Sequence, residues 1–279
     1  MKDFHSLNEY LNEKLVINKN YNNPYTYTPT SFDELREIIK QRYTEQGPGT
    51  EKNPIDFNDV DISNIYCFWD SNIGKSIFEE IEFEYIDISY WDVSKVKDMC
   101  YMFYRCEKLK SVGDLSNWNV SKVEDIESMF SCCEQLKSIG DLSKWDVSKV
   151  KDMNYMFYGC ENLNTVGDLS NWDVSSVEDM KFMFNDCINL ESVGDLSNWN
   201  VSSVENMRFM FEQCEELKSV GDLSKWNVSS VKYMSYMFTD CVQLKSVGDL
   251  SNWDVSKVKS MHYMFEGSGI TNIPDWYKE

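Results

Sequence analysis

The sequence predicts one stacked rod, a repeat solenoid, because it combines a fixed period, a regular apolar rhythm and nearly identical units. Tryptophan recurs every 27 residues without an insertion, at Trp91, Trp118, Trp145, Trp172, Trp199, Trp226 and Trp253. A fixed period of about 20 to 50 residues is typical of solenoids, in which each unit buries its apolar side against its neighbours. We therefore expect one continuous core along the repeats.

Apolar residues in each unit recur at nearly uniform three-residue steps. Counted from Trp as zero, they lie at +2, +5, +8, +12, +15, +18, +21 and +24; from Trp145 they are Val147, Val150, Met153, Phe157, Cys160, Leu163, Val166 and Leu169. A helix would mix steps of three and four, and a strand would alternate at two. Uniform threes indicate a coil that keeps turning, with very short strands and one helical turn around Met153–Cys160.

The repeated motif resembles a known family. The pattern L-K-S-V-G-D-L-S-x-W-[DN]-V-S-x-V-x-x-M-x-x-M-F-x-x-C is similar to the BspA-type leucine-rich repeat, the DUF285 class of bacterial surface-protein repeats. In the first full unit the matching residues are Leu109, Val112 and Leu115, with Gly113 as one extra residue, and Met102, Phe103 and Cys106. The resemblance covers about residues 56–276. It implies a right-handed leucine-rich-repeat-like solenoid with short parallel strands, which serves adhesion or protein binding and no reaction.

Residues 1–53 do not repeat and are predicted to form a small helical N-terminal cap. Two S-x-x-E capping boxes, Ser6–Glu9 and Ser31–Glu34, each open a short run with helical apolar spacing. The second run is the stronger helix prediction because its apolar residues share one face, namely Leu35, Ile38, Ile39 and Tyr43. A cap is expected because the first coil would otherwise expose its apolar side.

The solenoid is predicted to span 54–279, and residues 54–90 form a degenerate first coil. Val60 occupies the Trp place 31 residues before Trp91, so this coil carries four extra residues. Its run FEEIEFEYIDIS alternates apolar and acidic residues as a strand does, which would place Glu80, Glu82 and Glu84 on one side. These glutamates are either a solvated, charged sheet edge that blocks end-to-end stacking or an acidic patch that faces a partner.

Two polar columns are predicted to be structural. Position +15 carries a cysteine in six units, at Cys106, Cys133, Cys160, Cys187, Cys214 and Cys241. We interpret these as free thiols that act as small core hydrophobes. Position +23 is Asp114, Asp141, Asp168, Asp195, Asp222 and Asp249. Turn amides and the serines at +25 are expected to hold these carboxylates; a calcium ladder is disfavoured because one carboxylate per coil supplies too few oxygens. No metal, cofactor or catalytic residue is predicted.

Two columns of aromatic residues are expected to have different roles. The tryptophans are expected to stack coil on coil, with each indole N–H finding a partner. Position +10 carries Tyr101, Ser128, Tyr155, Phe182, Phe209, Tyr236 and Tyr263, outside the core rhythm. Its aromatic residues are either a partner-binding strip on a rigid surface or rings that simply pack on one another. Residues 268–279 depart from the repeat, with Ser268 in the cysteine place, and are predicted to be a C-terminal cap.

The amino-acid composition limits the partners and the cellular location that we expect. The net charge of −20 disfavours direct binding to nucleic acid or an anionic membrane and suits a basic protein partner. No run of about 18 apolar residues exists, so no membrane span is expected. The first residues, MKDFHSLNEYLNEKL, lack the apolar core of a signal peptide. We therefore expect a cytoplasmic chain, or one at the cell surface if an upstream signal was removed.

Three functions follow, and none is an enzyme. The first is a protein-binding scaffold that uses one side of an acidic rigid solenoid. The second is an intracellular inhibitor, of the phage or mobile-element counter-defence type, that occupies a basic nucleic-acid-binding groove by charge mimicry. The third, bacterial surface adhesion, follows from the family resemblance. The candidate partner-binding residues are Tyr101, Tyr155, Phe182, Phe209, Tyr236, Tyr263, Glu80, Glu82 and Glu84.

Overall fold

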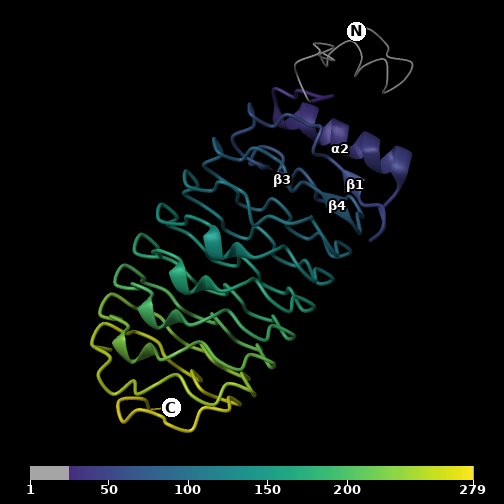
Figure 1. The fold of residues 1–279 in the computed structure, drawn as a ribbon. Coiled ribbons are helices and arrows are strands. Elements are labelled where there is room, and N and C mark those ends of the chain that lie inside the picture. Colours follow the sequence, from purple (N-terminus) through teal and green to yellow (C-terminus); the bar gives the residue numbers. More distant parts are fainter. Residues whose placement is uncertain (1–24, 279) are drawn as a thin grey trace.

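A computed structural model describes residues 25–278, which form coils stacked along one axis (Figure 1). The helix α2 (Phe32–Gln46) lies across the N-terminal end of the stack, and the coils follow in sequence order toward the C-terminal end (Figure 1). The first predicted capping box, Ser6–Glu9, lies outside the described residues. The repeat, leucine-rich-repeat-like architecture that the sequence predicts is the architecture of the described chain.

α2 begins at the second predicted capping box. Ser31 Oγ accepts the Glu34 N–H at 3.2 Å, while the Glu34 carboxylate accepts the Thr30 N–H at 2.8 Å. The helix ends where Gly47 takes φ 73° and donates its N–H to the Tyr43 carbonyl at 2.8 Å. Only glycine adopts this backbone without strain, so the sequence fixes both ends of the helix locally.

Two arginines attach α2 to the first coil. Leu35, Ile38 and Ile39 are at most 1% exposed and belong to the same apolar core as the coils. Arg36 donates to the Ser76 carbonyl and, at 2.9 Å, to the Glu79 carbonyl. Arg42 forms an ion pair with the Asp59 carboxylate at 2.5 Å. The helix is therefore held by buried charges as well as by apolar contact.

The first coil holds the strands of the described region, each two residues long. They are β1 (Ile55–Asp56), parallel to β4 (Ile86–Asp87), and β2 (Trp69–Asp70), antiparallel to β3 (Lys75–Ser76). The β2–β3 hairpin accommodates the extra residues of this coil. The strand predicted over FEEIEFEYIDIS is wrong for most of its length. Only β4 is a strand there, because Glu80 has φ 66° and the Ile81 N–H turns back to the Phe78 carbonyl.

From Trp91 onward the expected short strands are reduced to single bridged residues. Parallel bridges at +7 connect Asp98, Asp125, Asp152, Asp179, Asn206, Tyr233 and Ser260 in turn. From +8 to +15, alternate N–H groups donate to the next coil and the others turn back within their own coil. Phe157 N–H, for example, reaches the Met183 carbonyl at 2.9 Å, whereas Tyr158 N–H returns to Tyr155 at 3.1 Å. This pattern satisfies the backbone without a continuous strand.

The helical turn predicted around Met153–Cys160 is also wrong. That segment is a series of tight turns, and the short 3₁₀ helices lie at +24 to +26 instead. They are η1 (Leu142–Lys144), η2 (Leu169–Asn171), η3 (Leu196–Asn198) and η4 (Leu223–Lys225). Each is capped by the +23 aspartate, as Asp141 shows by accepting the Ser143 N–H at 2.9 Å. The predicted role of this column as a turn cap is confirmed.

The core follows the three-residue rhythm. All eight predicted inward side chains of the Trp145 unit are at most 1% exposed. The methionine at +11 is equally buried, as at Met156, which the rhythm did not predict. Neighbouring tryptophan rings stack with centroids 6.2–6.5 Å apart in the pairs Trp118–Trp145, Trp172–Trp199, Trp199–Trp226, Trp226–Trp253 and Trp253–Trp276. Trp145 Nε1 donates to the Leu115 carbonyl at 2.9 Å, and the other column indoles repeat this bond.

The cysteine column is made of free thiols. The Sγ of Cys160 donates to the Phe130 carbonyl at 3.2 Å, and the other +15 cysteines make the equivalent bond. Burial raises the pKa of the Cys160 thiol. These side chains act as small core hydrophobes with one weak donor, as predicted.

Candidate partner-binding face

The aromatic side chains at +10 form a stacked column along one side of the coils. Ring centroids lie 4.6 Å apart between Tyr155 and Phe182, 4.3 Å between Phe182 and Phe209, and 4.7 Å between Phe209 and Tyr236. The planes of these three pairs differ by at most 10°. Most of these rings are half-buried, so ring packing and partial exposure occur together.

The column has two distinct ends. At the N-terminal end Trp69 of β2 lies 4.6 Å from Tyr101, and Ser128 then separates Tyr101 from Tyr155. At the C-terminal end Tyr263 is tilted by 38° on Tyr236 and is 46% exposed. Inner rings cover one another's faces, so only their edges can meet a partner. Tyr263 is the member that combines high exposure with a loosened stack.

The backbone at +10 is left-handed in all seven units, with φ between 53° and 61°. Bulky residues rarely adopt this conformation, which costs roughly 1–2 kcal/mol per residue. A backbone hydrogen bond to the next coil offsets this strain. The Tyr155 N–H donates to the Lys181 carbonyl at 2.9 Å. Ser128 adopts the same conformation with φ 53°. The coil therefore dictates the backbone, and the backbone alone does not require an aromatic side chain at +10.

A column of carboxylates runs beside the rings at +7, and sequence reasoning missed it. Asp98, Asp125, Asp152 and Asp179 are half-buried and occupy consecutive coils. The Oδ1 of Asp152 accepts the Asn154 N–H at 2.9 Å. Burial, and then the neighbouring Asp125 and Asp179, raise the pKa of Asp152. The signal was present as Asp at every +7 from Asp98 to Asp179, but the longer +23 column concealed it.

The +6 and +7 side chains of four successive coils line a shallow groove of about 360 Å³. Its acidic members are Asp152, Glu178, Asp179 and Glu205. Two cations at +9 lie over aromatic rings beside this groove. Lys181 Nζ lies 4.9 Å from the centre of the Tyr155 ring, and the Arg208 guanidinium lies 4.0 Å from that of Tyr233, which lines the groove. We call the groove and the rings from Tyr155 to Tyr263 together the aromatic–acidic face.

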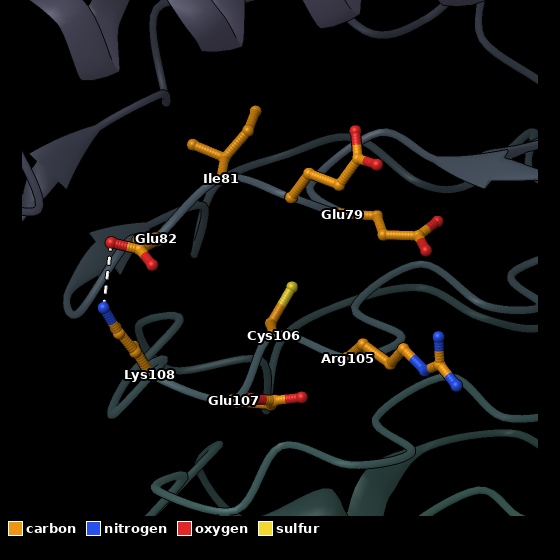
Figure 2. Close-up of a pocket in the computed structure, with 8 residues that line it drawn as sticks. Glu79, Ile81, Glu82, Arg105, Cys106, Glu107 and Lys108 are labelled. Atoms are coloured by element: carbon orange, nitrogen blue, oxygen red, sulfur yellow. Dashed lines mark ion pairs between the residues drawn. The ribbon is translucent and has the colours of Figure 1, made fainter.

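The predicted glutamates of the first coil lie apart from this face and already have cationic partners. Glu80 pairs with Lys75 at 2.5 Å. Glu82 pairs with Lys108 at 2.8 Å, as Figure 2 shows, and Glu84 forms the equivalent pair with Lys110. Glu80 and Glu82 line a pocket of about 300 Å³ between the first two coils, into which the Cys106 side chain projects (Figure 2). These ion pairs reduce the net negative charge that a partner would meet there.

Among residues 25–278, no group of three or more histidine, cysteine, aspartate or glutamate side chains is arranged to hold a metal ion. Within the same residues the structure holds no helix whose length and apolar character would let it span a bilayer. The aromatic–acidic face presents ring edges, a line of carboxylates and the cations Lys181 and Arg208.

Comparison with known protein families identifies the family to which the repeats belong. The family model described as "Mycoplasma protein of unknown function, DUF285" matches residues 71–190, 133–223 and 164–276, which together make up more than half of the chain. The chain belongs to this family. No curated protein matches the DUF285 chain.

Solved structures similar to the DUF285 chain are bacterial leucine-rich repeat proteins. One from Eubacterium ventriosum is 20% identical with a TM-score of 0.38, covering 70% of this chain and 40% of its own. One from Bacteroides ovatus is 16% identical with a TM-score of 0.28, covering 71% and 49%. The T. pallidum leucine-rich repeat protein is 17% identical with a TM-score of 0.25, covering 59% and 77%. The chain thus spans less than half of the first two proteins.

Proposed function

We propose that this chain is a protein-binding scaffold that carries out no reaction and takes its partner along the aromatic–acidic face. The observation that carries the proposal is the +10 column. Its backbone is equally well formed with Ser128, yet six of the seven units place an aromatic ring there. Rigid aromatic residues are enriched at the energetic centres of protein interfaces because they bury much area at little entropic cost.

The charges of the face point to the chemistry of the partner. The groove carries four carboxylates against the single cation Lys151 among its lining residues. Two of the groove carboxylates, Asp152 and Asp179, belong to bridged residues of adjacent coils and repel each other. A basic side chain from a partner would relieve this repulsion while its apolar neighbours covered the ring edges. The proposed partner is therefore a protein with a basic surface, and the glutamates Glu80, Glu82 and Glu84 are a secondary contact.

The test is a capture experiment with the purified chain and two pairs of variants. A specific partner should bind the parent and Tyr90→Ala, whose ring is 78% exposed but lies off the column. The same partner should bind Tyr263→Ala more than about tenfold more weakly, the loss expected where an aromatic side chain supplies much of the binding energy. Glu178→Lys should weaken binding, whereas Glu216→Lys, an exposed charge outside the groove, should not. Equal binding by Tyr263→Ala and Tyr90→Ala would remove the face from consideration.

The second candidate function, inhibition by charge mimicry, is favoured by the −20 net charge and the line of carboxylates. The same captured partner separates the two candidates. Mimicry of nucleic acid predicts that affinity falls by orders of magnitude between about 50 and 200 mM salt. An aromatic interface predicts a much weaker salt dependence. Surface adhesion, the third candidate, uses the same contacts outside the cell. The right-handed winding, the cap at 1–53 and the solenoid boundaries at 54–279 stay predictions.

A further inference from the structure

Three cysteines lie outside the +15 column, and two of them meet. Cys67 belongs to the first coil, Cys100 to the coil that starts at Trp91, and Cys132 to the next. The column thiols are buried and donate to backbone carbonyls. Cys67 and Cys132, in contrast, are part-exposed. Packing in the core therefore explains the +15 cysteines, but it does not explain Cys67, Cys100 and Cys132.

One carboxylate brings Cys67 and Cys100 together. The Sγ of Cys67 lies 3.7 Å from Asp98 Oδ2, and the backbone N–H of Cys100 donates to Asp98 Oδ1 at 2.9 Å. The two cysteines therefore come from adjacent coils and lie beside the same carboxylate. Because the Cys100 S–H stabilises the Cys67 thiolate, the pKa of Cys67 is lowered while that of Cys100 is raised. Cys132 has a hydroxyl neighbour instead, Ser131 Oγ at 3.8 Å.

We propose that Cys67 and Cys100 form a reversible redox pair, in which a disulfide links the first coil to the repeats. Cys67, the more exposed of the two, would attack first, and the buried Cys100 would resolve the intermediate. This division of roles is the usual arrangement of a redox-sensitive pair, where an accessible thiolate lies beside a second thiol. The proposal concerns a modification site and is independent of the partner-binding face proposed above.

The reaction needs a disulfide oxidant such as glutathione disulfide. The Cys67 thiolate attacks one sulfur of the oxidant, which releases one glutathione thiolate and leaves a mixed disulfide on Cys67. Cys100 then loses its proton and attacks the Cys67 sulfur, which expels the second glutathione. Two protein thiols become one disulfide, their two protons pass to the two glutathione thiolates, and the oxidant is thereby reduced to two thiols with no net release of protons.

The bond would act on the head of the aromatic column. Cys67 lies two residues before Trp69, whose amide and carbonyl both contact the Cys67 sulfur, at 3.4 and 3.1 Å. Cys100 immediately precedes Tyr101, whose ring lies 4.6 Å from that of Trp69. A disulfide would therefore fix this ring pair and hold the β2–β3 hairpin against the next coil.

The experiment oxidises the whole purified chain with glutathione disulfide and maps its peptides without reduction. Trypsin can cleave after Lys52, Lys75, Lys97 and Arg105, so it releases Cys67 and Cys100 on separate peptides. The expected product is one cross-linked pair of these peptides, which dithiothreitol separates. Oxidation should also raise the thermal midpoint of the parent by several degrees, because the bond restricts the unfolded chain.

Matched variants make the result decisive. Cys132→Ser removes the other part-exposed thiol and should keep both the cross-link and the thermal shift. Cys67→Ser should lose both, and Cys100→Ser should accumulate a stable glutathione adduct on Cys67. If a Ser variant does not fold, the cross-link in the parent still decides the matter. The proposal is overturned if the oxidised parent carries only glutathione adducts, or if its disulfides involve Cys132 as often as Cys100.

Discussion

The first coil and the regular coils differ in how they satisfy the hydrogen bonds of their buried polar groups. In the regular coils, the repeated buried donors bond to the same position of a preceding coil, as the Trp145 indole donates to the Leu115 carbonyl. In the first coil, side chains that do not recur in the repeats make these hydrogen bonds. Arg36 donates to the Ser76 carbonyl, and Ser76 Oγ donates to the Met102 carbonyl at 3.0 Å. The repeats are therefore interchangeable in principle, whereas the first coil is specific to the helix that covers it.

Deletion of whole coils tests this difference most severely. Removal of residues 172–198 joins Asn171 to Trp199 and recreates a native junction, with the Trp199 indole at the Leu142 carbonyl that Trp172 now uses. We expect a folded, cooperative but less stable protein, since each repeat contacts only its neighbours. Circular dichroism melts and gel filtration measure this.

Removal of residues 60–90, the matched deletion in the first coil, should instead abolish folding. Arg36 would lose the Ser76 and Glu79 carbonyls, and a buried charge without a partner costs about 3–5 kcal/mol. A soluble, cooperatively melting product would show that the first coil is as replaceable as the others. Aggregation of the 172–198 deletion would show that the repeats are not.

The repeats could be predicted largely because their information is periodic. Eight inward positions, the tryptophan ladder and the +23 caps follow from residue type and spacing alone. The helix between Ser31 and Gly47 could be predicted because capping is local chemistry. The left-handed backbone at +10 could not be predicted, because aromatic residues such as Tyr155 and Phe182 do not indicate a positive φ. The glycines at +14, Gly159 and Gly267, were the only residues that indicated such turns.

The candidate face and the first coil were harder to predict for physical reasons. Alternation in FEEIEFEYIDIS matched a strand, but Arg36 and the hairpin impose turns there, so tertiary contacts overrode the local pattern. The +7 carboxylates were visible as residues, yet their partial burial depends on how far the coil turns between +7 and +10. The meeting of Cys67 with Cys100 depends on the register of two unlike coils, which spacing cannot supply.

A glycine pair separates steric crowding between coils from backbone strain. Gly194 has φ 85°, and an added Cβ would clash with Asp168 Oδ1 of the preceding coil. Gly74 in the β2–β3 turn has φ 64° with open space around it. Both alanine variants bear the left-handed strain of about 1–2 kcal/mol. Gly194→Ala should lose a further 0.5–2 kcal/mol, roughly, because Asp168 must leave the Ser170 N–H that it caps.

Denaturant unfolding of the two variants measures the difference directly. The double variant Asp168→Ala/Gly194→Ala provides the control, since its cost should be smaller than the sum of the single costs. Equal losses for Gly194→Ala and Gly74→Ala would mean that the coils relax past the contact, and that glycine at +22 serves only its backbone conformation.

The smallest effect concerns two aspartates whose pKa values move in opposite directions. Asp152 lies in the +7 column, where burial and then Asp125 and Asp179 raise its pKa. Asp87 belongs to the first coil; burial opposes the change, but hydrogen bonds from Ser89 and Asn58 lower its pKa overall. A raised folded-state pKa means that the folded protein binds more protons between the unfolded and folded values, so Asp152 loses stability as pH rises through that window. Asp87 contributes stability above its unfolded pKa and loses it as pH falls through its lowered folded pKa.

Asparagine at each site should therefore have opposite consequences near neutral pH. Asp152→Asn keeps the Oδ1 that accepts the Asn154 N–H and removes a charge that its neighbours repel; Asn206 already occupies this column. It should raise the unfolding free energy by less than about 1 kcal/mol, because the site is partly solvated, and the gain should vanish in acid. Asp87→Asn should lower stability near neutral pH. Thermal melts across the acidic range decide between this and a column that a bound cation already neutralises, in which case Asp152→Asn would destabilise the protein instead.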